Sequence, residues 1–178
     1  LNALDWKITL VKDAESKKRP PPPFTTSTLQ QEGAKRLHYS SKKTMLLAQR
    51  LYEEGLITYM RTDSVNLSAE STTAAKAWLS ANLGERYASE APRSFKAKSK
   101  LAQEAHEAIR PTNPAHTPDE TSGREEAERK VYALIWKRFM TSQMPQAIVA
   151  SRTIETEGGA GKDAYTFRAT GQKIIFDG

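Results

Sequence analysis

The chain has no cysteine among its 178 residues. Without cysteine there is no disulfide framework, no thiolate nucleophile and no cysteine-ligated zinc site, and the absence indicates a reducing compartment. Long hydrophobic runs are missing too: no apolar stretch approaches the roughly 20 residues that a bilayer core requires, so we expect no membrane partner. The three histidines are scattered without ligand spacing. We therefore expect no metal site in this chain.

Positive charge is concentrated in the first part of the chain. The formal net charge is +6, with 27 basic and 21 acidic residues. Residues 1–100 include 17 basic and 10 acidic residues, whereas residues 101–178 include 10 basic and 11 acidic residues. This asymmetry favours a polyanionic partner, and nucleic acid over a membrane, because no basic amphipathic helix or lipidation signal accompanies it.

The ends of the chain are expected to form strands. Residues 6–11 alternate as a half-buried strand does, and a proline-rich linker over 20–23 follows. Further strands are expected over 147–155, 164–170 and 173–176. Because the chain starts with leucine and has no signal peptide, we expect it to be a piece of a longer protein.

Helical patterns fill the middle of the chain. The expected helix boundaries rest on three signals. Two pairs of residues have the spacing of a capping box, serine precedes an apolar run, and glycine follows an apolar run. The expected helices begin at Thr28 with Gln31 completing its box, run from Ser41 to Gly55, follow Ser68 until Gly84, span Leu101–Arg110, and begin after Ser122 with Glu125 completing its box. The predicted fold class is mostly α with flanking β, a helical domain inserted into a partial β domain.

The basic residues of positions 91–100 form the densest positive cluster. Four cations and no acid fall within these ten residues: Arg93, Lys96, Lys98 and Lys100. Such a stretch predicts an exposed basic loop.

Tyr59 and Arg61 are the first candidate catalytic pair. They are two residues apart, so in an extended segment both project to the same side. A tyrosine hydroxyl is almost entirely un-ionised at neutral pH, but a guanidinium about 4 Å away would stabilise the phenolate by roughly 4 kcal/mol at an effective dielectric near 20. The arginine could also hold a phosphate. The alternative is a buried tyrosine with a surface arginine at a strand end.

His106 and Arg110 form the second candidate pair. Their spacing of four places both on one face of the helix expected there, with Glu107 turned aside, where two donors could meet phosphates. A solvated helix face is the alternative. Asp63 could orient Arg61 or cap the turn that follows it.

Three longer motifs contain these residues, and together they resemble three successive motifs of type IA DNA topoisomerases. The motifs are Pro23 to Glu32, Leu56 to Ser64 and Ala102 to Thr112. The resemblance covers about residues 20–176, and Met60 between the tyrosine and the arginine is more similar to the bacterial topoisomerase I branch.

The resemblance implies a role for each candidate. Tyr59 is similar to the nucleophile that forms a 5′-phosphotyrosine with single-stranded DNA, and Arg61 is similar to the arginine that contacts the scissile phosphate. His106 matches a phosphate-contacting histidine. Thr58, Asp63 and Arg110 are further candidate DNA contacts in the same motifs.

The same resemblance implies an organisation within a toroidal enzyme. Residues 1–27 are expected to be the first part of a β arch with a proline-rich linker, 28–143 the helical domain, and 144–178 the returning strands. Expected partners are single-stranded or negatively supercoiled DNA and the remaining domains of the polypeptide. The expected location is the bacterial cytoplasm, at the nucleoid.

The chain also departs from the family pattern. The family's metal-binding domain with clustered acids, which supplies Mg²⁺, has no match here, nor do cysteine-rich zinc ribbons. The densest acids, Glu125, Glu126 and Glu128, fall in the first turn of a predicted helix, where they complement its dipole. We therefore expect this chain alone not to relax supercoils.

Two other classes of function remain open on the residues alone. One is a non-catalytic module that binds single-stranded nucleic acid through the basic loop and exposed aromatics. The other is a helical domain whose partner is a protein, which predicts no salt-dependent affinity for DNA.

Overall fold

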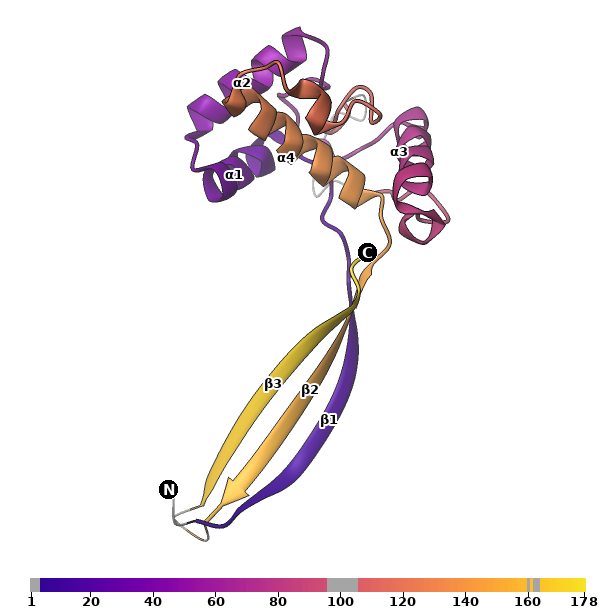
Figure 1. The fold of residues 1–178 in the computed structure, drawn as a ribbon. Coiled ribbons are helices and arrows are strands. Elements are labelled where there is room, and N and C mark those ends of the chain that lie inside the picture. The colour runs from indigo at the N-terminus through magenta and orange to yellow at the C-terminus, as the bar shows by residue number, and fades with distance from the viewer. Residues whose placement is uncertain (1–3, 96–105, 160, 162–163) are drawn as a thin grey trace. The chain divides into compact units, whose positions relative to one another are not determined.

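The computed structural model describes residues 4–95, 106–159, 161 and 164–178 (Figure 1). The chain divides into two compact units, one formed by Leu1–Arg19 with Gln146–Gly178 and the other by Pro20–Pro145. Among the described residues, four α-helices lie in the second unit and a three-stranded antiparallel sheet forms the first. Among the described residues, no helix is long and apolar enough to cross a membrane.

The sheet has the order β1-β2-β3. Its strands are β1 (Trp6–Lys18), β2 (Ala147–Gly158) and β3 (Tyr165–Phe176). Both pairings are antiparallel, and the ladder of β1 and β2 runs from Trp6 opposite Gly158 to Lys18 opposite Ala147. Gly158 is required at its position, because a Cβ there would come within 2.7 Å of the Trp6 ring.

The strands are longer than the sequence pattern predicts. β1 continues through the charged stretch after residue 11, and β3 runs without a break through Gly171. Cross-strand ion pairs accommodate the charges: Arg152 contacts Asp13 at 2.7 Å, and Arg168 contacts Glu155 at 2.5 Å. Opposite charges facing each other across a ladder stabilise the pairing, so a charged stretch need not end a strand.

The described part of the helical unit contains four α-helices and two short 3₁₀ helices. They are α1 (Thr26–Leu37), α2 (Ser41–Glu53), α3 (Ala69–Leu83), η1 (Glu85–Tyr87), η2 (Pro118–Thr121) and α4 (Glu126–Ser142). Ser68 caps α3 as expected, accepting the backbone N–H of Ser71. Gly55, with a φ of 73°, and Gly84, with a φ of 94°, take the backbone past the ends of α2 and α3 in conformations that favour glycine.

Both predicted capping boxes are wrong in detail. The box of α1 is formed by Thr25 and Thr28, so the helix begins two residues earlier than Thr28. The N-cap of α4 is Glu125 and makes no side-chain cap hydrogen bond, so the box expected from Ser122 does not form. The preceding 3₁₀ helix η2 ends at Thr121, and Ser122 is the C-cap of η2 rather than the N-cap of α4.

The helix expected over Leu101–Arg110 is also wrong where the structure describes it. Residues 101–105 lie outside the described residues, and residues 106–110 are not helical. Ile109 instead forms an antiparallel bridge with Phe24, donating its backbone N–H to the Phe24 carbonyl at 2.8 Å. Partners distant in sequence take the backbone hydrogen bonds that a local helix would use.

One hydrophobic core fills the helical unit. α4 is its centre, with Val131, Tyr132, Ile135 and Phe139 at 0% exposure. Leu47, Ala48 and Leu51 of α2 and Leu29 of α1 are buried against the same core. Three residues from the motif segments, Ile57, Met60 and Ile109, also belong to it. The core therefore extends directly beneath the candidate site.

Candidate functional site

The segment that carries Tyr59 alternates between exposed and buried side chains. Tyr59, Arg61 and Asp63 are exposed, with Tyr59 at 46%. The side chains that alternate with them are buried: Met60, Thr62 and Ser64. The alternation leaves both Tyr59 and Arg61 exposed, although the backbone bends at Thr58, Met60 and Arg61 and is not a regular strand. Arg61 does not line the pocket beside the tyrosine.

The backbone just after Tyr59 is held by the first residue of α1. The Thr26 hydroxyl donates to the carbonyl oxygen of Met60 at 2.8 Å and accepts the backbone N–H of Thr62 at 2.9 Å. The Thr26 N–H donates to the Thr62 carbonyl at 2.9 Å. The first and second motifs of the sequence therefore meet at this point.

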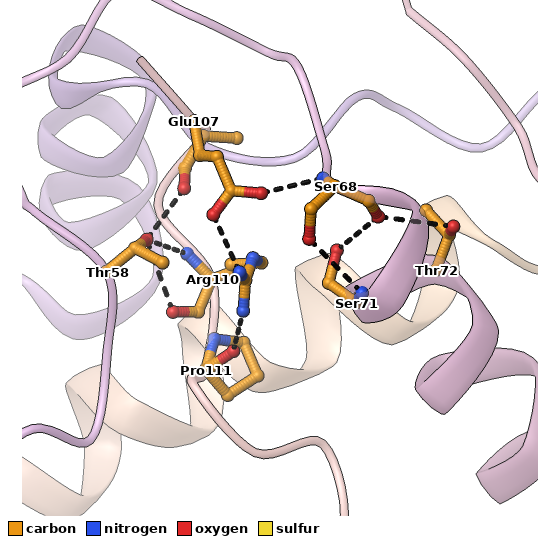
Figure 2. Close-up of polar contacts among 8 residues, drawn as sticks. Thr58, Ser68, Ser71, Thr72, Glu107, Arg110 and Pro111 are labelled. Atoms are coloured by element: carbon orange, nitrogen blue, oxygen red, sulfur yellow. Dashed lines mark hydrogen bonds and ion pairs between the residues drawn. The ribbon is translucent and has the colours of Figure 1, made fainter. Parts of the chain in front are cut away.

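The backbone just before Tyr59 is held by the third motif (Figure 2). The Thr58 hydroxyl donates to the Ala108 carbonyl at 2.7 Å and accepts the backbone N–H of Arg110 at 3.0 Å. The Thr58 N–H in turn donates to the Arg110 carbonyl at 2.9 Å. Tyr59 is thus an exposed side chain on a backbone that is hydrogen-bonded on both sides.

A pocket of about 360 Å³ opens beside the tyrosine. Its lining residues come from α2 and from the second and third motifs: Tyr52, Thr58, Tyr59, Thr62, His106 and Glu107. The Tyr52 ring meets the Tyr59 ring edge to face, with 5.2 Å between centroids. His106 is exposed, so a hydroxyl and an imidazole face the same open pocket.

Arg110 occupies a different environment from the other candidates. Its side chain is only 12% exposed, and its Nη2 contacts the Glu107 carboxylate at 2.6 Å. Nη1 donates to the carbonyl of Pro111 at 3.0 Å. The expectation that Glu107 is turned aside is wrong, because residues 106–110 are not helical and the Glu107 carboxylate contacts the Arg110 guanidinium.

Asp63 and the basic loop are the remaining candidates. Asp63 is exposed, and the turn after it is capped by hydroxyls on either side: Thr62 accepts the N–H of Ser64, and Ser64 accepts the N–H of Asn66. Of the expected basic loop, Arg93 is described and donates to the Ser89 hydroxyl at 3.1 Å. Lys96, Lys98 and Lys100 lie outside the described residues.

Within the described ranges, no three histidine, aspartate or glutamate side chains gather as a metal site would require. The acids at the start of α4 are ion-paired instead. Glu125 and Glu128 both contact Arg50, at 3.2 and 3.1 Å, and Glu126 contacts Lys130 at 2.6 Å. These residues do not fit a Mg²⁺ site, so no chemical step is assigned to a metal held by them.

Sequence reasoning missed Tyr52, Thr26 and the contacts of Glu107. Tyr52 lies on α2, seven residues before Tyr59, and only the turn at Gly55 brings the two rings together. Thr26 lies in the first motif, but nothing local indicates that it contacts the second. Glu107 is adjacent to His106, which is the one signal that could have drawn attention to it.

Comparison with known proteins agrees with the motifs. A family model described as DNA topoisomerase matches residues 1–178. DNA topoisomerase 1 of Haemophilus influenzae is 43% identical over 178 residues, and that of Synechococcus elongatus is 46% identical over 179; each match covers 100% of this chain and 20% of the relative. The chain thus spans about a fifth of the length of these relatives.

A solved structure gives the same result for the fold. Full-length topoisomerase I from Thermotoga maritima matches with a TM-score of 0.82 and 38% identity, covering 99% of this chain and 29% of that one. The family match extends over the whole chain. The second and third motifs line one pocket, and the first motif is hydrogen-bonded to both of them. This chain belongs to the DNA topoisomerase family, with bacterial DNA topoisomerase 1 among its relatives.

Proposed function

We propose that this chain is the tyrosine-bearing part of a type IA DNA topoisomerase and that Tyr59 is its nucleophile. The observation that carries the proposal is the exposure of Tyr59 in a pocket shared with His106, on a backbone hydrogen-bonded before and after it. A nucleophile must be accessible and held in place at once, because misplacement by about 1 Å can cost 10²-fold in rate.

In the proposed reaction the Tyr59 Oη attacks a phosphorus atom of single-stranded DNA. A phosphorus–oxygen bond to the tyrosine forms, and the bond from phosphorus to the 3′-oxygen breaks. The tyrosine loses its proton and the departing 3′-oxygen gains one, which leaves a 5′-phosphotyrosine and a free 3′-hydroxyl. Attack by that hydroxyl reverses the step and reseals the strand, so no ATP is consumed.

The neighbouring residues act on the phosphates in this proposal. Arg61 is exposed, as Tyr59 is, and supplies a cation for the scissile phosphate, where a guanidinium can donate two parallel hydrogen bonds. His106, which lines the same pocket, contacts an adjacent phosphate. Thr58 and Asp63 remain proposed DNA contacts. Arg110 is mostly buried against Glu107, and this favours an internal role for its side chain.

The proposed organisation follows that of the longer enzyme. Residues 28–143 are the helical domain that carries the tyrosine, inserted into a β arch domain of the toroid formed by 1–27 and 144–178. The remaining domains of the polypeptide supply Mg²⁺ and the other wall of the site. The substrate is single-stranded or negatively supercoiled DNA, in the bacterial cytoplasm. This chain alone therefore does not relax supercoils.

Covalent trapping tests the nucleophile. The full-length enzyme that contains this chain is incubated with Mg²⁺ and end-labelled single-stranded DNA, denatured, and mapped by mass spectrometry. We expect a 5′-phosphate adduct on Tyr59 that Tyr59→Phe abolishes. Tyr165→Phe is the matched control, because Tyr165 is also 46% exposed but lies on β3.

Two results would contradict the proposal. An adduct on a residue other than Tyr59 would assign the chemistry elsewhere. A folded full-length enzyme that binds single-stranded DNA but forms no adduct would instead support the non-catalytic binding module.

A further inference from the structure

We propose that Glu107 is a positioning residue for the cleavage step, holding His106 and Tyr59 in register across their shared pocket. The inference rests on the proposed function and extends it to a residue that does not itself react. Glu107 is the centre of a small polar cluster at one wall of the pocket (Figure 2).

Glu107 uses both carboxylate oxygens. Oε1 accepts the backbone N–H of Ser68 at 2.6 Å, and Oε2 accepts Nη2 of Arg110 at 2.6 Å. The carboxyl side chain is 31% exposed and the arginine 12% exposed, so the pair is partly shielded from water. Charge-assisted hydrogen bonds of this length are roughly twice as strong as neutral ones.

The first of these contacts fixes the third motif to α3. Ser68 is the N-cap of α3, and its own hydroxyl accepts the N–H of Ser71 at 3.2 Å. A carboxylate at this end of a helix is favoured by the helix dipole. Because His106 directly precedes Glu107, the same contact sets the path of the backbone that carries the imidazole.

The contact between Glu107 and Arg110 connects the third motif to the segment that carries Tyr59. Arg110, held by Glu107, accepts the backbone N–H of Thr58 at its carbonyl and donates its own backbone N–H to the Thr58 hydroxyl. Thr58 is the residue before Tyr59. The Thr58 hydroxyl also donates to the carbonyl of Ala108, next to Glu107 in the chain. One carboxylate therefore links the backbone of the imidazole to the backbone of the nucleophile.

Glu107→Gln tests this arrangement with little change in shape. A glutamine amide has one accepting oxygen, so its NH₂ group must face either the Ser68 N–H or the Arg110 guanidinium, donor against donor. One of the two links is lost while the volume of the side chain is kept. Arg110→Lys is a second variant that keeps the cation but removes the two-nitrogen fork.

The experiment measures single-turnover cleavage of labelled single-stranded DNA by the full-length enzyme, together with DNA affinity and thermal unfolding. We expect Glu107→Gln to slow cleavage by about 10- to 100-fold, with DNA affinity changed less than about 2-fold. The matched control is Glu70→Gln, an exposed carboxylate in the first turn of α3, which should cleave at the wild-type rate.

The decisive readout is a double-mutant cycle with His106. If Glu107 acts by keeping His106 in register with Tyr59, this role disappears once the imidazole is removed, and adding Glu107→Gln to His106→Ala should slow cleavage by less than about 3-fold. A general loss of stability would instead multiply with the histidine substitution. If Glu107→Gln does not fold, Arg110→Lys is carried through the same cycle with the same expectation.

Several outcomes would overturn the inference. These are wild-type cleavage by Glu107→Gln, effects that multiply in the cycle, or a loss of DNA affinity as large as the loss of rate, which would make Glu107 part of the binding surface. The proposed function is judged separately: it fails if the wild-type enzyme forms no Tyr59 adduct, whatever the variants do.

Discussion

The helical unit and the sheet are stabilised in different ways. The buried hydrophobic cluster lies entirely within residues 24–140, in the helical unit. In the sheet, Val149 is the buried apolar side chain, while Ile8 and Ile174 are each 65% exposed and Phe167 is 54% exposed. Burial of apolar surface therefore stabilises the helical unit, and the sheet depends on its hydrogen-bond ladder and on cross-strand pairs.

The difference accounts for where the candidate site lies. In the proposed reaction Tyr59 must be open to a large substrate while its backbone stays fixed. The neighbours Ile57 and Met60 belong to the core, at 1% and 5% exposure, so the segment is anchored by the same packing that stabilises the unit. A reactive side chain is more accurately placed on such a platform than on an element with two exposed faces.

The largest expected difference between the two units is the loss of stability when a large apolar side chain is truncated to alanine. Phe139→Ala removes a side chain with 0% exposure from the centre of α4 and should lower the free energy of unfolding by about 3–5 kcal/mol. Ile174→Ala, at 65% exposure in β3, should change it by less than about 0.5 kcal/mol. Urea unfolding followed by circular dichroism measures both. Equal costs would show that the sheet also has an apolar core.

A smaller effect should appear only at alkaline pH. Burial of the Tyr132 hydroxyl, with the nearby Glu120 charge, raises its pKa to about 12, and the hydroxyl donates to the His116 carbonyl at 2.6 Å. The ordinary value is near 10, so the stabilisation is complete below pH 10 and is lost as the pH rises from 10 to 12.

The free energy of unfolding falls by at most roughly 3 kcal/mol, because the pKa of Tyr132 differs by about two between the folded and unfolded states and each pKa unit corresponds to about 1.36 kcal/mol. Urea midpoints measured between pH 9 and pH 12 for the wild type and for Tyr132→Phe test it. The wild type should lose more stability than Tyr132→Phe over this range, and parallel curves would contradict the assignment.

The smallest effects compare polar contacts in the two units. Thr25→Ala removes the cap of α1 and should cost about 1 kcal/mol. Asp13→Asn in β1 breaks a fully exposed ion pair with Arg152, which solvent screens, and should leave the unfolding midpoint unchanged within error. Thermal unfolding of the two variants measures this. A larger loss from Asp13→Asn would mean that the sheet depends on its charges.

Features set by local sequence were predictable from it. Ser68 and Gly84 mark the ends of α3 because capping and a positive φ depend on one or two residues. The length of β1 was not predictable, because Asp13 finds its partner 139 residues away. The helix expected at 101–110 does not form at Ile109 for the same reason, because the backbone N–H of Ile109 donates to the distant carbonyl of Phe24.

In the candidate site too, features set by local sequence could be predicted, and features set by contacts between distant residues could not. Tyr59 and Arg61 could be selected because their spacing and their motif are contiguous. The roles of Tyr52 and Glu107 depend on a ring contact and on a carboxylate that reaches Ser68, and these exist only after folding. The sequence pattern therefore indicated the exposed side chains that we propose face the substrate, but not the residues whose contacts hold the backbone around them.

The register of the sheet has a consequence for the order of folding. Lys18 at the end of β1 lies opposite Ala147 at the start of β2, so the whole of Pro20–Pro145 is a loop between paired strands. Closing a loop of that length in an unstructured chain carries a large entropy cost, which local helix formation does not. Helices that fold first would shorten the effective loop. We therefore expect β1 and β2 to pair late, after the helical unit has formed.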